Sequence, residues 1–349
     1  MTRRPGILAV DGGGSKIDVA LLRRDGQVLG ATRMRLGDLD RTTWLVQPLI
    51  EERHLVPVGA AIAQVARQAG LEPDGVPIAD IGVFCLAGAD LPADERRLYS
   101  WVRDSGWVVR PEVRNDTFAV LRTGTDRSWG VAVVCGYGTN CTGVAPNGRV
   151  TRFPAVGPVS GDWGGGSEIG SMAAWYAIRS EDGRGPKTAL QRLVPEHFGL
   201  RRPRQLTEAL YFERIDEERL SELPPLVFQA AADGDAVARD IVNRQADEIV
   251  TMAGTAIRRL RMAKLDVEVV LGGGIFRNRY DPFFERIREG LLAVAPASSI
   301  VPLAAPPLVG AALIGLDLAG ARPAARRTLR AALTDERLAT HTRPRRKER

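Results

Sequence analysis

Short apolar runs separated by glycine-rich turns mark the start of the chain. The run Ile7–Val10 leads into a turn with three consecutive glycines, and a second run, Ile17–Leu22, is followed by a tight Asp25-Gly26 turn. Apolar runs of this length between turn residues are typical of buried β-strands. The pattern therefore predicts a strand, a glycine turn, a second strand, a tight turn and a third strand.

A similar order of parts returns over Trp129–Phe153. Here the turn is Gly136-Tyr137-Gly138 followed by Thr139, and Asn147-Gly148 closes the hairpin. Repetition of one supersecondary unit predicts two related halves that face each other across a cleft. Because glycine lets a backbone approach a ligand closely, each turn could direct its N–H groups at a phosphate. A chance recurrence of two ligand-free hairpins is the alternative.

The remaining chain alternates apolar strands with amphipathic helices, which predicts a mixed α/β protein of two domains. Strands are expected over residues 78–87, 108–114, 267–271 and 300–303, and helices over 58–69, 93–105, 169–179, 186–198, 203–211, 236–262, 282–293 and 308–319. After residue 322 the chain is rich in arginine. It predicts one weak helical segment, Thr328–Leu338, and disorder over Thr340–Arg349.

Three carboxylates stand beside these turns. Asp11 ends the first strand, where it can hold a cation, through water, next to a bound anion. Asp116 follows a predicted strand and precedes a helix, a position where Asp commonly caps the helix, but where a cleft residue would also lie. Asp162 is surrounded by glycines, which indicates close packing against a ligand or another backbone, with a flexible surface loop as the alternative. A third glycine turn, Gly272–Gly274, suits a flat base or sugar lying against backbone.

Composition and charge exclude several classes of protein. The formal net charge is +6, but residues 322–349 carry ten Arg or Lys against three Asp or Glu, so the rest of the chain is close to neutral and predicts no nucleic-acid surface. No apolar run is long enough for a membrane span, and the first run lacks a signal-peptide cleavage site. Cys85, Cys135 and Cys141 lie in apolar segments without metal-ligand spacing, which favours buried, reduced thiols in a cytoplasmic protein.

Six segments together resemble a known family. They are Val10–Gly30, Leu86–Asp90 (LAGAD), Asn115–Val120 (NDTFAV), Cys135–Cys141 (CGYGTNC), Ser160–Gly170 (SGDWGGGSEIG) and Leu271–Asn278 (LGGGIFRN). In this order they resemble the BadF/BadG/BcrA/BcrD-type ATPases, and within them the N-acetylglucosamine kinases, of the sugar kinase, actin and heat-shock chaperone superfamily. The resemblance implies an α/β fold of two actin-like (ribonuclease H-like) domains facing a central cleft. It implies a division into domains 1–117 and 118–321, with a basic, partly disordered tail at 322–349.

The resemblance also implies roles for single residues. Asp116 would be the catalytic base, and Asp11 would lie near Mg²⁺. The residues implied in ATP binding are Gly12, Gly13, Gly14, Ser15, Lys16, Gly136, Tyr137, Gly138, Thr139, Gly272, Gly273 and Gly274. The residues implied in sugar binding are Asp38, Asp116, Thr139, Asn140, Gly157 and Asp162.

The activity that the resemblance implies is ATP- and Mg²⁺-dependent transfer of the γ-phosphate to a hydroxyl, at position 6, of N-acetylglucosamine or a related amino sugar or hexose. Relatives of this kind suggest a homodimer. Three positions depart from the family pattern. Tyr137 replaces the Thr of a common GTG turn, Val156-Gly157 replaces Trp-Gly, and Asp38 and Asp40 lie where relatives carry an Asn that contacts the sugar substituent. Either Asp could favour a free amine or an unmodified hydroxyl.

Two other functions remain open on sequence alone. One is an activator of the same family that couples ATP hydrolysis to electron transfer through an iron–sulfur cluster shared between subunits. Cys135 and Cys141, six residues apart across a hairpin, suit that role poorly. The other is a sugar-sensing protein without catalysis, which an intact Asp116 and the lack of a DNA-reading helix pair disfavour.

Overall fold

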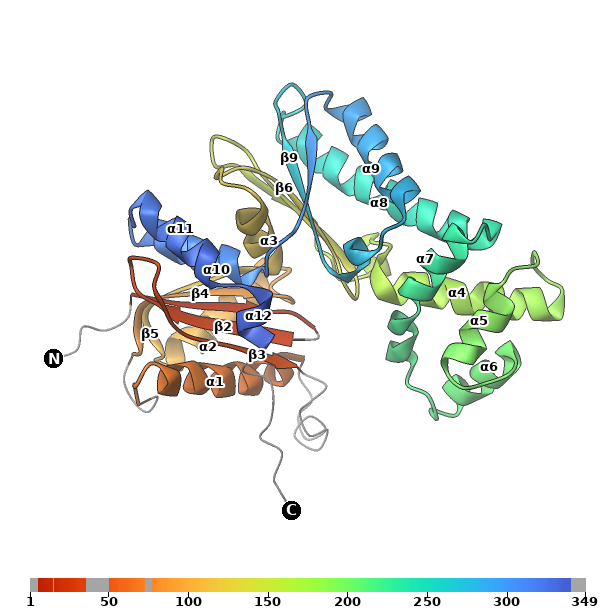
Figure 1. The fold of residues 1–349 in the computed structure, drawn as a ribbon, viewed down its shortest axis with the longest axis horizontal. Helices are drawn as coiled ribbons and strands as arrows, with labels where there is room; N and C mark the ends of the chain where they lie inside the picture. Colours follow the sequence, from red (N-terminus) through yellow and green to blue (C-terminus); the bar gives the residue numbers. More distant parts are fainter. Residues whose placement is uncertain (1–5, 15, 36–49, 73–76, 340–349) are drawn as a thin grey trace, which may run out of the picture. The chain divides into compact units, whose positions relative to one another are not determined.

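The computed structural model describes residues 6–14, 16–35, 50–72 and 77–339. They form two compact units, one within residues 1–128 and 303–349 and the other within 129–302. Each unit contains a five-stranded sheet with helices packed on it (Figure 1). This confirms the mixed α/β fold expected from the sequence.

The sheet of the first unit has the strand order β3-β2-β1-β4-β5. Its strands are β1 (Ile7–Gly12), β2 (Lys16–Leu22), β3 (Val28–Arg35), β4 (Ala79–Leu86) and β5 (Val108–Asn115). The first three strands pair antiparallel, as the two tight turns between them require, and β4 and β5 continue the sheet in parallel. The predicted hairpin is therefore confirmed.

Helices cover both faces of this sheet. Alternate residues of β1 point to opposite faces, so Leu8 and Val10 pack with α1 (Ile50–Gln68) and α2 (Pro92–Asp104), while Ile7 and Ala9 pack on the other side. The helices of that second face are α3 (Asp116–Gly124), α10 (Leu308–Leu318), α11 (Pro323–Ala332) and α12 (Asp335–Ala339). Because both faces are covered, the strands read as continuous apolar runs rather than alternating ones.

The sheet of the second unit repeats the same pairing in the order β10-β9-β6-β7-β8. Its strands are β6 (Gly130–Cys135), β7 (Thr139–Val144), β8 (Val150–Arg152), β9 (Glu268–Gly272) and β10 (Ser299–Pro302). As in the first unit, three strands form an antiparallel meander and the first of them also pairs in parallel with a later strand. The predicted repeat of strand, glycine turn and strand is thus confirmed at the level of sheet topology.

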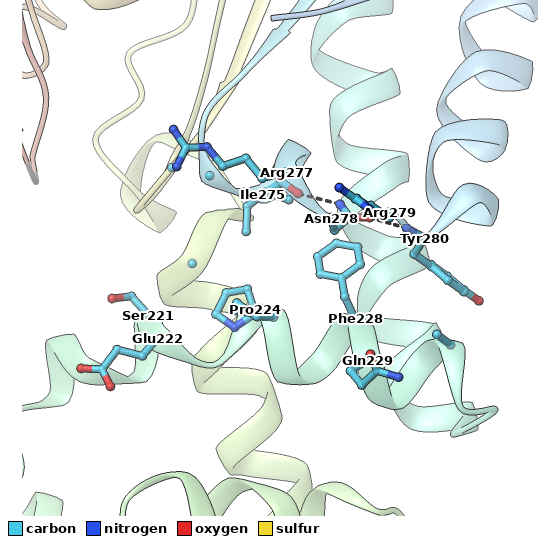
Figure 2. A pocket seen from close by; sticks show the side chains of 15 residues that line it. Ser221, Glu222, Pro224, Phe228, Gln229, Ile275, Arg277, Asn278, Arg279 and Tyr280 are labelled. Atoms are coloured by element: carbon cyan, nitrogen blue, oxygen red, sulfur yellow. Dashed lines mark hydrogen bonds between the residues drawn. The ribbon is translucent and has the colours of Figure 1, made fainter. Parts of the chain in front are cut away.

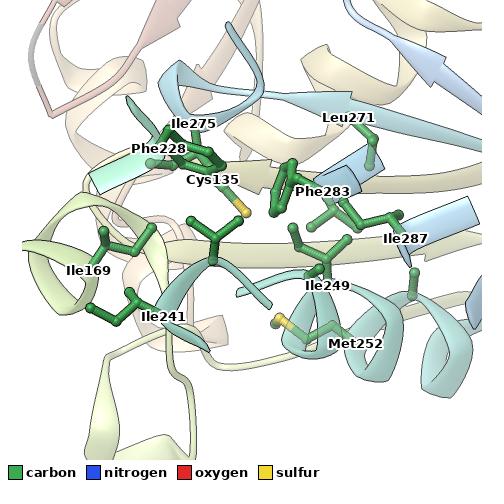
Figure 3. Packing of buried hydrophobic residues seen from close by; sticks show 14 of the residues in the cluster. Cys135, Ile169, Phe228, Ile241, Ile249, Met252, Leu271, Ile275, Phe283 and Ile287 are labelled. Carbon is green, nitrogen blue, oxygen red and sulfur yellow. The ribbon is translucent and has the colours of Figure 1, made fainter. Parts of the chain in front are cut away.

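The helices of the second unit are α4 (Gly165–Asp182), α5 (Leu190–His197), α6 (Pro203–Tyr211), α7 (Pro224–Ala232), α8 (Ala236–Arg259) and α9 (Asp281–Val294), with short 3₁₀ segments η3 (Pro158–Ser160), η4 (Glu217–Glu222) and η5 (Gly274–Arg277). Figure 3 shows part of their core, in which Phe283 of α9 lies among aliphatic side chains of α8 and β9. The ring of Phe283 meets that of Phe228 edge to face, with centroids 5.1 Å apart. The sequence predicted five of these six helices and missed α7.

The division into units differs from the one expected at residue 117. Helices α3 and α10 pack on the first sheet so tightly that a Cβ on Gly310 would lie 1.9 Å from the carbonyl oxygen of Ala119. A Cβ on Gly315 would lie 2.5 Å from the side chain of Ile7. The chain therefore returns to the first unit after residue 302, and the second unit is an insertion between α3 and α10.

The arginine-rich tail differs from the expectation in its first part. Residues 323–339 form α11 and α12, which bury Ala325, Leu329 and Leu338 against the first unit. A Cβ on Gly26, at the β2–β3 turn, would lie 2.1 Å from the carbonyl oxygen of Ala325. The expected disorder of Thr340–Arg349 lies outside the described residues. None of the helices described here is both long and apolar enough to cross a membrane.

Candidate functional site

The first glycine turn joins β1 to β2. The N–H of Gly13 donates to the carbonyl of Lys16 at 3.0 Å, and the carbonyl of Gly12 accepts from the N–H of Ala87 at 2.7 Å. A Cβ on Gly12 would lie 2.7 Å from Leu86, whereas the space beside Gly14 is open. Gly12 is therefore needed for packing, and Gly14 leaves room for a ligand. Ser15 lies outside the described residues.

Asp11 precedes this turn and is buried. In the sheet it stands opposite Asp18 of β2 and Cys85 of β4. Burial, together with the negative charges of Asp18 and Asp116, raises the pKa of Asp11 to about 8, while the positive charge of Lys16 opposes the shift. The structure thus brings two of the predicted site carboxylates, Asp11 and Asp116, within electrostatic range of each other.

The donor set around Asp11 fits a magnesium ion that keeps most of its water. Mg²⁺ is usually bound by one or two carboxylates together with waters and substrate phosphates rather than by an all-protein cage. Among the described residues no group of three or more His, Cys, Asp or Glu could hold a metal by itself. A single buried carboxylate next to a glycine turn has the chemistry that such a phosphate-bound cation requires.

Asp18 is fully buried and is neutralised by two cations. Arg33 of β3 donates to both of its carboxylate oxygens at 2.7 Å, and the Lys16 ammonium donates at 3.0 Å. Arg33 also pairs with Asp335 of α12 at 2.9 Å. The hydrogen bond to Asp18 holds the pKa of Arg33 above its ordinary value. The family resemblance implied a role for Lys16 but none for Asp18, Arg33 or Asp335.

Asp116 is the first residue of α3, directly after β5. The helix is capped by Asn115, whose side-chain oxygen accepts from the N–H of Thr117 at 3.1 Å and from its hydroxyl at 2.5 Å. The interpretation of Asp116 as the N-cap is therefore wrong. Its half-buried carboxylate lies in the first turn of α3.

The second glycine turn, in the second unit, is held by the start of α4. The N–H groups of Gly166 and Ser167 donate to the carbonyls of Gly136 and Tyr137 at 2.8 and 3.0 Å, and the N–H of Gly136 donates to the carbonyl of Gly138 at 2.9 Å. The first N–H groups of a helix have no partner within it, so they are free to fix a neighbouring turn. The Tyr137 side chain is exposed.

The glycines before α4 serve this packing. Gly165 has φ +82° and a Cβ there would lie 2.6 Å from the backbone of Gly138. A Cβ on Gly164 would meet the side chains of Gln245 and Thr139. Gln245 of α8, fully buried, accepts from the N–H of Gly165 at 2.7 Å. Of the two interpretations of this glycine run, the structure favours close contact with another backbone.

Four predicted sugar-binding residues follow this turn along the chain. Thr139 is buried at the start of β7, with its hydroxyl 3.6 Å from the sulfur of Cys135, and Asn140 is half-buried beside it. Asp162 is half-buried and accepts a hydrogen bond from the Ser160 hydroxyl. Gly157, with φ +86°, begins the 3₁₀ turn that leads to Asp162. Asp38 and Asp40 lie outside the described residues.

A pocket of about 570 Å³ opens where the second and third glycine turns meet η4, α7 and the η5–α9 connection (Figure 2). Its lining includes Gly136, Gly166, Ser221, Pro224, Phe228, Gly274, Ile275, Arg277, Asn278 and Tyr280. Of the third turn only Gly274 reaches the pocket. Gly273 instead packs on β6, since a Cβ there would lie 2.2 Å from the carbonyl oxygen of Cys135. The sequence missed Phe228, although Pro224-Pro225 before an apolar run is a helix-start signal.

The three cysteines are free and buried, as the sequence predicted. Burial raises the pKa of each thiol, to about 12 for Cys135. Such thiols are unreactive at neutral pH. They do not present a surface on which two subunits could share a cluster.

Comparison with models of protein families identifies the family of this chain. A model of the BadF/BadG/BcrA/BcrD ATPase family matches residues 8–315, from β1 into α10. The chain belongs to this family. Membership of an ATPase family implies the use of ATP, and the matched region contains every glycine turn described above. Residues 316–349, with α11 and α12, lie outside the match.

The chain is similar to two named kinases along most of its length. The N-acetylmuramic acid/N-acetylglucosamine kinase of Clostridium acetobutylicum is 25% identical over 315 residues, covering 88% of this chain and 97% of the relative. The N-acetyl-D-glucosamine kinase of Dictyostelium discoideum is 26% identical over 321 residues, covering 89% of this chain and 97% of the relative. The match is thus to whole proteins and not to one shared domain.

Solved structures share the fold. A crystal structure from Chromobacterium violaceum, provisionally named as an N-acetylglucosamine kinase, has a TM-score of 0.65 at 21% identity, covering 90% of this chain and 99% of that one. A ROK family glucokinase from Streptomyces griseus, in complex with glucose and AMPPNP, has a TM-score of 0.50 at 15% identity, covering 88% and 98%. The fold is therefore that of actin-like sugar kinases.

Proposed function

We propose that this protein is an ATP- and Mg²⁺-dependent sugar kinase that transfers the γ-phosphate to a hydroxyl, preferentially the primary 6-hydroxyl, of N-acetylglucosamine or a related amino sugar. The observation that carries the proposal is the pair of carboxylates at the first glycine turn. Asp11, buried at the end of β1, suits a cation, and Asp116, half-buried at the start of α3, suits a base. The relatives named as N-acetylglucosamine kinases support the same class of reaction.

Phosphoryl transfer needs the acceptor hydroxyl in line, the phosphate charge neutralised and a base for the hydroxyl proton. Asp11 would hold a Mg²⁺ ion, which would neutralise phosphate charge when bound. The backbone of the first turn, open at Gly14, approaches the phosphates closely. Asp116 then accepts the proton of the sugar hydroxyl, a contribution of about 10²–10⁴-fold in rate.

The pocket of the second unit is proposed to hold the adenosine part of ATP. Its volume falls within the usual range for small-molecule sites of about 300–1,000 Å³. The backbone at Gly274 leaves open space, and Phe228 and Pro224 supply an apolar wall for a flat base. Asn278 supplies an amide, although its Nδ2 already donates to the carbonyl of Ile275 at 2.6 Å.

Thr139, Asn140, Gly157 and Asp162 of the second unit are proposed to bind the sugar. A pyranose hydroxyl is a hydrogen-bond donor, so carboxylates such as Asp116 and Asp162 can accept from it. Asp162 already accepts from the Ser160 hydroxyl, which fixes the orientation of the carboxylate. Asp38 remains a candidate for distinguishing an amine or hydroxyl from an N-acetyl group.

The test is ADP formation with ATP, Mg²⁺ and a panel of N-acetylglucosamine, N-acetylmuramic acid, glucosamine and glucose, followed by location of the phosphate on the product by NMR. We expect sugar-dependent ADP formation, with the phosphate on the 6-oxygen. ADP formation that no sugar stimulates would contradict a kinase. A strong preference for N-acetylglucosamine over glucosamine and glucose would contradict the role suggested for Asp38.

A further inference from the structure

A continuous series of ion pairs runs from the C-terminal helix α12 to the first glycine turn. Asp335 of α12 pairs with Arg33 of β3, Arg33 holds both oxygens of Asp18, and Asp18 holds the ammonium of Lys16. Lys16 opens β2 directly after the turn. The series therefore connects a segment outside the family match with a residue proposed to contact ATP.

The two cations on Asp18 differ in what they can do. The Arg33 side chain is 12% exposed, and its planar guanidinium binds both oxygens of the carboxylate. The Lys16 side chain is 27% exposed and carries its charge on a flexible aliphatic chain. Asp18 is fully buried, so it is very costly to leave without a cation. Lys16 can turn from Asp18 towards a phosphate only if Arg33 stays in place.

We infer that Arg33, fixed by Asp335, is a positioning residue: it keeps Asp18 neutralised and thereby releases Lys16 to bind phosphate oxygens of the nucleotide. Asp335 contacts Nη2 of Arg33, the nitrogen that also donates to Asp18, and this second contact restrains the orientation of the guanidinium. The α11–α12 extension is in this way part of the phosphate-binding machinery. The inference rests on the proposed function, because it assigns the nucleotide as the ligand of Lys16.

The test measures KM for MgATP and kcat at saturating sugar. Arg33→Ala should raise KM by about tenfold, equivalent to about 1.4 kcal/mol of lost phosphate binding, because Lys16 is then the cation left on Asp18 among the described residues and is retained there. The kcat should change little, because Asp116 is untouched. Adding Asp18→Asn to Arg33→Ala should restore most of the affinity for MgATP, because Lys16 is then no longer held. A merely structural role of Arg33 predicts no such recovery.

Asp335→Asn should raise KM by a smaller factor, and Asp335→Glu should restore it. The matched control is Asp126→Asn, which breaks a different ion pair of the C-terminal helices, Arg330–Asp126 at 3.0 Å, and should leave KM unchanged. If Arg33→Ala does not fold, Arg33→Lys, which keeps the charge but loses the planar guanidinium, takes its place. An unchanged KM in the Arg33 variant, or a double variant no better than the single one, would overturn the inference.

If the wild-type protein phosphorylates no sugar, the proposed function is wrong, but the role of Arg33 in MgATP binding can still be tested. Calorimetric titration with MgATP needs no acceptor, and the same order of affinities among the variants is expected. Equal affinities of wild type and the Arg33 variant in that titration would count against the inference alone.

Discussion

The two glycine turns have the same place in two sheets of the same topology, yet their surroundings differ in kind. The turn at β1–β2 is bordered by two buried carboxyl groups, Asp11 and Asp18, and Asp18 is paired with Lys16 and Arg33. The turn at β6–β7 is bordered by backbone groups of α4 and by the neutral amide of Gln245. The same sheet topology therefore surrounds one turn with ionisable side chains in the first unit and the other turn with backbone hydrogen bonds in the second.

The difference follows from what each sheet can bury. Charges stay buried only where opposite charges accompany them, and β2, β3 and α12 supply Lys16 and Arg33 with Asp335. The second turn needs no ions, because helix N–H groups satisfy its carbonyls directly. Changes that remove the charges of the first turn should therefore affect chemistry and pH dependence, while changes at the second should affect stability.

The largest effect is expected from Asp116→Ala. Loss of the base should lower kcat by about 10²–10⁴-fold while leaving the affinity for MgATP close to that of the wild type. Steady-state kinetics and calorimetric titration give the two quantities. Asp104→Ala, at an exposed carboxylate of α2 in the same unit, is the control and should retain activity. Retained transfer in Asp116→Ala would remove the assignment of the base.

Asp11→Asn should separate activity from stability. We expect loss of Mg²⁺-dependent turnover together with a higher melting temperature of the ligand-free protein at pH 8. The pKa of Asp11 is raised from 3.8 to about 8 in the folded state. Between these pH values Asp11 ionises only in the unfolded state, so the free energy of unfolding falls as pH rises. The increase in the free energy of unfolding caused by Asp11→Asn should therefore be at most a few kcal/mol near pH 8 and should vanish near pH 4. A gain that does not vary with pH would contradict the role of burial.

Gly165→Ala and Gly14→Ala compare the turns directly. At Gly165 the added Cβ meets the backbone of Gly138 at a positive φ, so unfolding free energy should fall by about 3 kcal/mol. At Gly14 the space is open, so stability should change by less than about 1 kcal/mol, while KM for ATP rises because the methyl group enters the phosphate space. Urea denaturation and kinetics measure both. Equal destabilisation by the two changes would refute the comparison.

Gln245→Leu should have the smallest effect of the four. It removes the buried acceptor of the Gly165 N–H, which costs about 1–3 kcal/mol of stability. Urea denaturation should show this loss, and Gln229→Leu, at an exposed residue of α7 whose amide pairs only locally with Asp233, should not. A neutral Gln245→Leu would mean that the turn is held by α4 alone.

The strands and turns were predictable because their signals are local. Apolar runs bounded by glycine predicted β1, β2, β6 and β9, and the repeated order of parts predicted two related sheets. The helix α7 was missed because its apolar stripe is short, and the docking of α11 and α12 was missed because their arginine-rich composition resembles a solvated tail. Their burial depends on Leu329 and Leu338 reaching a sheet formed more than 200 residues earlier in the chain.

The sequence by itself determined the family, the two hairpins and the residue types at each turn, since these depend on neighbours along the chain. Only the tertiary structure decided what each residue does there. It showed that Gly165 and Gly273 make room for backbone while Gly14 and Gly274 leave open space, and that burial raises the pKa of Asp11. Steric contact and desolvation arise between segments distant in sequence, so no local pattern records them.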